Sequence, residues 1–203
     1  MPSIIDLARD EASQLLQPGY LPFESGFKNL DNNILLVAAL TRMHYCRKDM
    51  VEWWFAHGLS PREHTAIYKL WHNVDHVRGE WDEKWSSGNY IGASHIVDET
   101  LGGKPPVYKL KINFQEPSLL YDTSKFKDAN ATAMVAYIYD RDRGLRLGVM
   151  THYVRDTYLG CEMRSRFWLE NANTEIARNL FQHCVEEMSN LAVLLPYFFR
   201  IKK

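Results

Sequence analysis

The sequence predicts an α+β protein in which a curved antiparallel sheet wraps around one long C-terminal helix. Three observations predict this arrangement. Residues 34–44 form an apolar segment with β-branched side chains, which is typical of a strand. From residue 91 onward, apolar and polar residues alternate with a period of two in consecutive short segments, which favours antiparallel pairing. The chain then continues with apolar residues at spacings of three and four, which indicate a helix.

An N-terminal extension precedes this core. Residues 3–16 predict a short amphipathic helix, and the polar residues that follow, up to residue 33, predict a loop. The sequence contains no internal repeat and no linker. We therefore expect one domain over residues 1–203, with an extension at 1–33 and the core at 34–195.

Two short helices are predicted after the first strand. Asp49 stands where it could cap the first of them, and Gly58 ends it. The series Ser60-Pro61-Arg62-Glu63 is a capping box with proline at the first helical position, so a second helix is predicted from there through Leu70 or further. Gly79 interrupts the segment that follows.

Five strands and the last helix complete the pattern. The strands are predicted at residues 92–99, 107–114, 133–140, 146–155 and 161–169. The last helix is predicted from Asn173 to about Leu195. A strand, two short helices, a run of antiparallel strands and one long helix follow each other in the order of the helix-grip (Bet v 1-like) architecture. In that architecture the sheet encloses a cavity against the helix.

Composition and charge exclude several classes of protein. The 24 Lys+Arg and 25 Asp+Glu residues give a net charge of −1, so nucleic-acid binding through phosphate neutralisation is not expected. No apolar run approaches the roughly 18 residues that a membrane helix needs, and the acidic N-terminal segment does not resemble a signal peptide. Three cysteines without a CxxC pair favour a reduced, cytoplasmic protein. Aromatic residues, at 13% of the chain, suit either a large core or a pocket for an aromatic ligand.

The apolar stripe of the last helix is interrupted by two polar residues. His183 and Glu187 occupy positions where the spacing predicts apolar side chains, and they lie one helical turn apart on the same face. A carboxylate buried there needs a cation, a partner or a wet cavity, and a divalent metal would satisfy both residues. The alternatives are a structural His–Glu contact or a helix rotated so that Cys184 and Met188 face the core instead.

Further metal ligands are available elsewhere in the chain. On the strand at 92–99, Glu99 shares one face with His95, and it would be a third ligand unless it is solvated beside the following turn. His72 and His76 lie four residues apart on what the pattern allows to be helix, and either could be a fourth ligand or an ordinary surface or core histidine. His152, in an apolar strand, is either a core histidine or a proton-transfer group.

Other charged residues favour simpler interpretations. Glu186 lies about 100° around the helix from Glu187 and is expected to be solvated. Arg164 and Arg166 share one strand face, which indicates either a solvated face with Glu162 as the partner or a site for an anion.

Several of these blocks together resemble the diacetylphloroglucinol hydrolase and phloretin hydrolase family. The resemblance spans roughly residues 18–195, and its most specific pieces are Trp53-Trp54-Phe55, Trp71-His72 with Asp75-His76, and Glu162-Met163-Arg164-Ser165-Arg166-Phe167-Trp168. It implies a Bet v 1-like domain and a zinc ion held by two histidines and two glutamates. It also implies hydrolysis of the carbon–carbon bond between an acyl group and a polyhydroxylated aromatic ring.

The resemblance also implies roles for individual residues. His183 and Glu187 match the helix ligands, and Glu99 matches the strand glutamate. The remaining histidine matches His72 or His76; His72 is favoured because it directly follows the aromatic block. His152 matches the cavity histidine that transfers protons. The chain is shorter than the characterised hydrolases, and no tyrosine is matched to the ring hydroxyls.

Several functions suit such a site. Zinc fits the ligand set, and Fe²⁺ or Mn²⁺ would accept the same ligands. Besides hydrolysis, the metal could support decarboxylation, isomerisation or cyclisation of a phenolic or polyketide-like metabolite. Without a metal, the cavity would suit a non-catalytic binding protein. The expected partner in every case is a small aromatic or polyketide-like molecule. The sequence leaves the oligomeric state open, with a homodimer among the alternatives.

Overall fold

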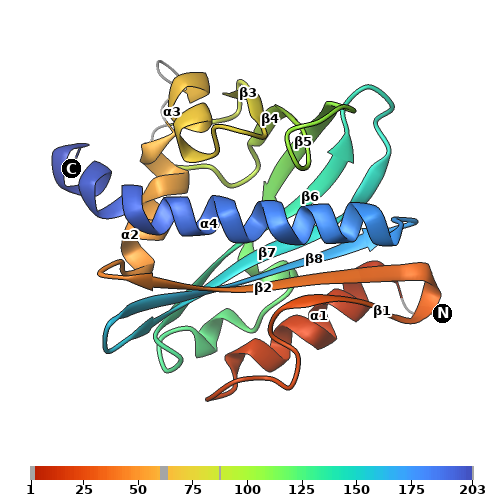
Figure 1. Ribbon diagram of the computed structural model, residues 1–203. Coiled ribbons are helices and arrows are strands. Elements are labelled where there is room, and N and C mark those ends of the chain that lie inside the picture. Colours follow the sequence, from red (N-terminus) through yellow and green to blue (C-terminus); the bar gives the residue numbers. More distant parts are fainter. Residues whose placement is uncertain (1–2, 60–63, 87, 203) are drawn as a thin grey trace.

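The computed structural model describes residues 3–59, 64–86 and 88–202 (Figure 1). Within these ranges, eight antiparallel strands form one sheet in the order β1-β2-β8-β7-β6-β5-β4-β3. The strands are β1 (Gly26–Asn29), β2 (Ile34–His44), β3 (His76–Trp81), β4 (Ser94–Glu99), β5 (Tyr108–Gln115), β6 (Ala131–Asp140), β7 (Arg146–Thr157) and β8 (Gly160–Glu170). The helices are α1 (Ile4–Ser13), α2 (Lys48–Trp53), α3 (His64–Trp71) and α4 (Thr174–Lys202). The long helix α4 crosses one face of the curved sheet, so the predicted helix-grip fold is confirmed.

Helix α4 buries a wide apolar face against the sheet. Cys184 and Met188 are fully buried in the core, and His183 is also buried on the same helix. The helix continues through Pro196 to Lys202, beyond the predicted end near Leu195. Proline has no N–H group to donate to the carbonyl four residues earlier, and the Cys46 thiol donates to that carbonyl, on Ala192, at 3.4 Å. The core contact thus satisfies the group that proline leaves free.

A second apolar cluster lies on the opposite face of the sheet. Helix α1 covers this convex face, where Leu15 and Trp168 are fully buried. Arg164 and Arg166 point to the same side and are buried, which corrects the prediction of a solvated face paired with Glu162. Both guanidinium groups instead donate to the carboxylate of Glu24.

The sequence predicted the central strands better than the edges. The strand at 34–44 has the predicted bounds, and the five later strands lie within a few residues of theirs. The two edge strands β1 and β3 were not predicted. The region at 17–33 was expected to be a loop and contains β1, and the segment around Gly79 was expected to be interrupted and contains β3.

The packing of α3 explains the glycine in β3. A Cβ atom at Gly79 would lie only 2.8 Å from the Tyr68 ring, so glycine allows the helix to lie against the strand. The predicted capping box at residues 60–63 lies outside the described residues. The first short helix has Arg47, and not Asp49, at its N-cap.

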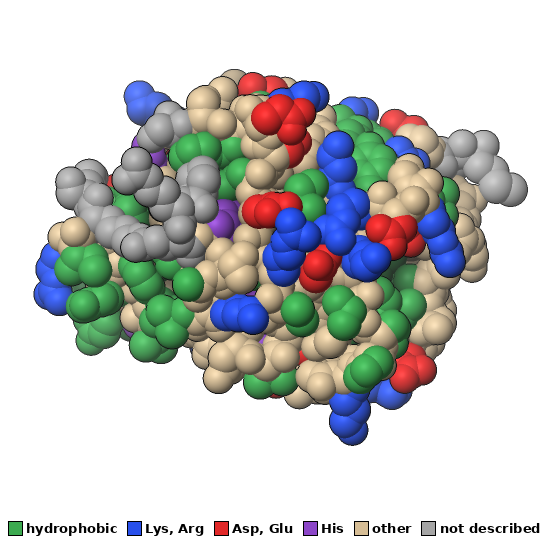
Figure 2. All heavy atoms as spheres, turned by 90° about the horizontal axis from the view of Figure 1, so that it is seen from above, with side chains coloured by type: hydrophobic (Ala, Val, Ile, Leu, Met, Phe, Trp, Pro, Cys, Tyr) green, Lys and Arg blue, Asp and Glu red, His purple; other side chains and the backbone are tan. Residues whose placement is uncertain are grey.

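One face of the molecule carries charged side chains of both signs. Figure 2, which views the side of α3, β3 and β4, shows acidic and basic side chains interspersed on this face. Ion pairs of the protein include Arg141 with Asp98 at 2.7 Å and Lys109 with Asp142 at 2.9 Å. Among the described residues, no helix has both the length and the apolar character that crossing a membrane would require.

Candidate metal centre

The candidate site begins where β3 pairs with β4. His76, the first residue of β3, lies opposite Glu99, the last residue of β4. Tyr68 on α3 contacts both: its ring stacks on His76 with centroids 3.6 Å apart, and its hydroxyl donates to Glu99 Oε2 at 2.7 Å. All three side chains are buried. The packing of α3 therefore fixes a histidine and a glutamate side by side.

The orientation of His76 determines which ring nitrogen is free. Its Nδ1 lies 2.7 Å from the backbone oxygen of Tyr68, which can only accept, so Nδ1 carries the proton. In a neutral ring Nε2 then has no proton, and within the described part of the chain it is buried without a hydrogen-bond partner. It lies 3.3 Å from Glu187 Oε1. An unprotonated buried nitrogen beside a carboxylate fits a divalent cation, whose charge would satisfy both groups.

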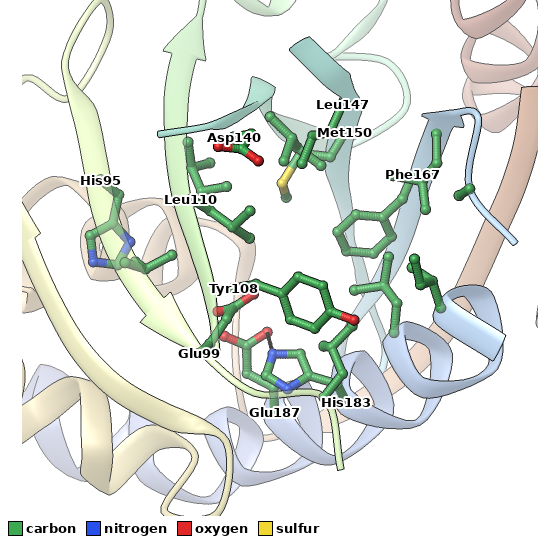
Figure 3. A pocket seen from close by; sticks show the side chains of 18 of the residues that line it. His95, Glu99, Tyr108, Leu110, Asp140, Leu147, Met150, Phe167, His183 and Glu187 are labelled. Carbon is green, nitrogen blue, oxygen red and sulfur yellow. Dashed lines mark ion pairs between the residues drawn. The ribbon is translucent and has the colours of Figure 1, made fainter. Parts of the chain in front are cut away.

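Helix α4 supplies the other side of the cluster. His183 Nε2 lies 3.9 Å from Glu187 Oε2, and one ligand atom from each of His76, His183 and Glu187 lies within 4.8 Å of the others. Burial raises the pKa of Glu187, but the neighbouring His76 and His183 rings outweigh it and lower that pKa. Figure 3 shows His183 and Glu187 converging with Glu99 at one end of a cavity. The cluster therefore favours positive charge.

Asp75 holds His183 from behind. Its Oδ2 accepts a hydrogen bond from His183 Nδ1 at 2.9 Å, which leaves Nε2 facing Glu187. Its Oδ1 accepts from the Thr100 hydroxyl at 2.7 Å and from the Gly103 amide. Burial lowers the pKa of His183, but Asp75 and the charges of Glu99 and Glu187 raise it to about 9. One carboxylate thus connects α4 to the segment that follows Glu99.

His72 lies close to this cluster but in a different orientation. It follows the last residue of α3, and its Nδ1 accepts a hydrogen bond from the Asp75 amide at 3.1 Å. A neutral ring with an accepting Nδ1 carries its proton on Nε2, which lies 3.4 Å from Glu186 Oε2. Burial and the charges of His183 and His76 lower the pKa of His72. Like His76 Nε2, this nitrogen is buried without a hydrogen-bond partner among the described residues, and His72, Asp75 and His183 form a second group of side chains that could hold a metal ion. Glu186 itself is exposed, as the sequence predicts.

His152 lines the cavity from β7. Its Nδ1 lies 2.8 Å from the Ser165 hydroxyl, and its ring stacks on Phe55 with centroids 5.9 Å apart. Burial lowers its pKa to about 4, although the charge of Glu187 opposes the shift. The ring is therefore neutral at pH 7, which allows it to accept and return a proton.

The cavity encloses about 300 Å³ between α4 and strands β4–β8. The metal cluster lies at one end of it, together with Tyr68 and His152. The remaining lining is mostly apolar, with Leu110, Met150 and Phe167 among its members, as Figure 3 shows. The sequence did not decide whether the aromatic residues form the core or line a pocket. Trp71 and Phe114 do both, because they belong to the core and also line the cavity.

The structure brings most of the predicted site residues together. Glu99, His152, His183 and Glu187 line the cavity, and His72 and His76 each belong to a group with His183 that could hold a metal ion. Tyr68 and Asp75 were given no role from the sequence. Both lie in the blocks that carry the family resemblance, which is the one signal that could have identified them.

Solved structures of other proteins share the fold. A major latex-like protein from Panax ginseng has a TM-score of 0.53 at 9% identity, with 81% of this chain and 99% of that chain covered. Ara h 8.0201 has a TM-score of 0.52 at 6% identity, with 81% and 99% covered. Identities this low show the shape of the chain and no more.

Sequence comparisons identify the family. The chain is 28% identical over 192 residues to the 2,4-diacetylphloroglucinol hydrolase of Pseudomonas protegens, covering 87% of this chain and 58% of that protein. It is 24% identical over 209 residues to the phloretin hydrolase of Eubacterium ramulus, covering 88% and 72%. The chain spans about 60% of the length of the diacetylphloroglucinol hydrolases it matches. The model of the DAPG hydrolase PhiG domain matches residues 7–175, and the chain therefore belongs to this family.

Proposed function

We propose that the chain is a divalent-metal-dependent hydrolase that cleaves the carbon–carbon bond between an acyl group and a polyhydroxylated aromatic ring. The observation that supports it most is the cluster of His76, His183 and Glu187 at one end of a largely apolar cavity. The relatives named as hydrolases of 2,4-diacetylphloroglucinol and phloretin support the class of substrate.

The proposed ligands are His76 and His183 through Nε2, Glu187, and Glu99 from the facing strand. In both histidines Nδ1 donates to an oxygen, which is the arrangement that presents Nε2 to a metal. Of the two candidate histidines we propose His76, because in a neutral His72 ring the accepting Nδ1 leaves the proton on Nε2. Two histidines and two carboxylates suit zinc, and Fe²⁺ or Mn²⁺ would accept the same ligands.

The reaction adds water across the bond. The oxygen of water joins the acyl carbon, the bond from that carbon to the ring breaks, and the ring carbon takes up a proton. The bound cation would supply Lewis-acid chemistry by polarising a carbonyl oxygen and acidifying water.

Side chains of the protein transfer the protons of this reaction. Neutral His152 accepts a proton, and because its pKa is about 4 the protonated ring is more acidic than a free imidazolium and gives the proton to the ring carbon. The Tyr68 hydroxyl, held by Glu99, offers a second polar group beside the metal cluster. The apolar lining excludes bulk water, which strengthens these polar interactions.

Two measurements test the proposal. Elemental analysis should find about one divalent metal per chain, and hydrolysis of an acylphloroglucinol in ¹⁸O-water should place the label in the released carboxylic acid. Glu187→Ala should lose the metal, whereas Glu186→Ala, one position away and exposed, should retain it.

Each failure has a distinct meaning. Unchanged metal content in Glu187→Ala would contradict the ligand assignment. Product without the ¹⁸O label would indicate decarboxylation, isomerisation or cyclisation. A protein without metal, whose ligand affinity is the same in Glu187→Ala, would be a binding protein.

A further inference from the structure

The cavity has two ends with different chemistry. Next to the metal cluster, Tyr68, Glu99 and His152 offer hydrogen-bond donors and acceptors. Towards the start of α4 and the turn between β6 and β7, Asp140, Glu170 and Asn171 line the cavity, but most of the lining is apolar. It includes Leu110, Ile138, Leu147, Met150, Phe167 and Leu180. Figure 3 shows Leu110, Leu147, Met150 and Phe167 on the side of the cavity away from Glu187 and His183.

The secondary structure explains this separation. Met150 lies two residues from His152 on β7 and pairs with Phe167, whereas His152 pairs with Ser165. On α4, Leu180 lies one turn before His183. Because side chains two apart on a strand and three or four apart on a helix share a face, the polar and apolar groups form successive layers of one cavity.

The charged side chains at the rim beyond the apolar layer already have hydrogen-bond partners within the protein. The Arg146 guanidinium donates to both oxygens of Glu170 at 3.0 and 3.2 Å, and Asp140 accepts from the Arg143 amide at 2.9 Å. A polyhydroxylated ring in the apolar layer would bury hydroxyl groups without partners, which is unfavourable. The ring therefore belongs at the metal end, and another part of the substrate fills the apolar layer.

Resting on the function proposed above, we propose that the apolar layer is a subsite for the acyl chain, and that the substrates are polyhydroxylated aromatic ketones whose acyl chain is longer than acetyl. An acetyl group would offer this layer a single methyl group. Each further methylene buried there adds favourable burial of apolar surface. The subsite selects chain length and leaves recognition of the ring to the metal end.

A series of substrates tests this subsite directly. Acetyl-, butanoyl- and hexanoylphloroglucinol share the ring and differ only in the acyl chain. We expect kcat/KM to rise by up to about fourfold per added methylene, and at least tenfold from acetyl to hexanoyl. The dissociation constants, from quenching of tryptophan fluorescence, should fall in the same order.

The two readouts separate failure of the subsite from failure of the reaction. If no member of the series is hydrolysed, the proposed function fails, and the order of the dissociation constants still decides the subsite. If acetylphloroglucinol binds as tightly as hexanoylphloroglucinol, the subsite is wrong whether or not either compound is hydrolysed.

A matched pair of variants locates the effect. Leu180→Phe should fill the apolar layer and reduce the preference for hexanoyl over acetyl at least fivefold in binding. Val193→Phe, on the exposed side of the same helix, should leave that preference unchanged. Leu147→Phe fills the layer from β7 and replaces Leu180→Phe should that variant not fold. Equal loss of affinity for both compounds in the folded variant would overturn the assignment.

Discussion

The two faces of the sheet bury charged side chains in different ways. On the convex face, Arg164 and Arg166 share the carboxylate of Glu24, and Arg164 also donates to the Leu15 carbonyl at 3.1 Å. On the concave face, His76 Nε2 lies buried beside Glu187 with no hydrogen bond among the described residues. Buried ionisable groups occur on both faces, but the concave cluster also includes a histidine nitrogen without a hydrogen-bond partner among the described residues.

The difference separates a structural role from a functional one. On the convex face, the group of Arg164, Arg166 and Glu24 (the convex group) connects β8 to the segment around Glu24. It therefore holds the N-terminal part of the chain on the sheet. Its donors are already used, which argues against the anion site that the sequence left open. Buried charge by itself is thus a poor guide to function, and the unused hydrogen-bonding capacity is a better one.

The largest expected effect is the loss of stability on removing the Glu24 carboxylate from the convex face. Glu24→Ala leaves two buried guanidinium groups without their carboxylate, so we expect unfolding in urea to show a loss of about 3–5 kcal/mol. Metal content should not change, because Glu24 lies on the opposite face. Asp142→Ala, which removes an exposed ion pair, is the control and should have little effect. Loss of metal in folded Glu24→Ala would show that the two faces are not independent.

The second-largest effect is expected at Asp75, which orients the proposed metal ligand His183. The carboxylate of Asp75 accepts hydrogen bonds from His183, Thr100 and Gly103, and asparagine must place an N–H group against one of these donors. We expect Asp75→Asn to weaken zinc binding about 10–100-fold, measured by competition with a chromophoric chelator.

A second buried aspartate gives the matched control. Asp156 is as buried as Asp75 but accepts from the Lys48 amide at another part of the fold. Asp156→Asn should lower stability and leave zinc affinity unchanged. Equal zinc affinity in both variants would contradict the role of Asp75 in orienting His183, and would leave it only the structural role of binding the loop after β4.

The sequence predicted the two site residues on α4 because a long helix reports its own periodicity. His183 and Glu187 interrupt an apolar stripe, and that pattern needs no knowledge of the rest of the fold. Strand β3 gives no such signal. It is a six-residue edge strand with charged side chains and a glycine, and its pairing with β4 holds it in place.

The missed strand affects the choice of histidine. Treating residues 72 and 76 as one helix makes His72 and His76 equivalent, whereas the helix ends at Trp71 and His76 begins a strand. The hydrogen bonds that then distinguish the two rings come from Tyr68 and Asp75. The hydrogen bonds that the Asp75 carboxylate accepts from Thr100 and His183 span 25 and 108 positions, so no local pattern could predict them.

The smallest effect tests whether the concave face keeps His152 neutral. Its pKa falls from 6.5 to about 4 on folding because of burial, so between these values the unfolded chain takes up a proton that the folded chain does not. Stability is therefore lost as the pH falls from 7 to 5, by about 2 kcal/mol from this residue. His152→Gln in metal-free protein should lose that much less stability over this range, measured by urea unfolding at both pH values. His44→Gln, which removes an exposed imidazole, should behave as the unmodified chain does. If His152→Gln and the unmodified chain lose stability equally, His152 is solvated enough to be protonated in the folded protein, and its role as a neutral proton acceptor is wrong.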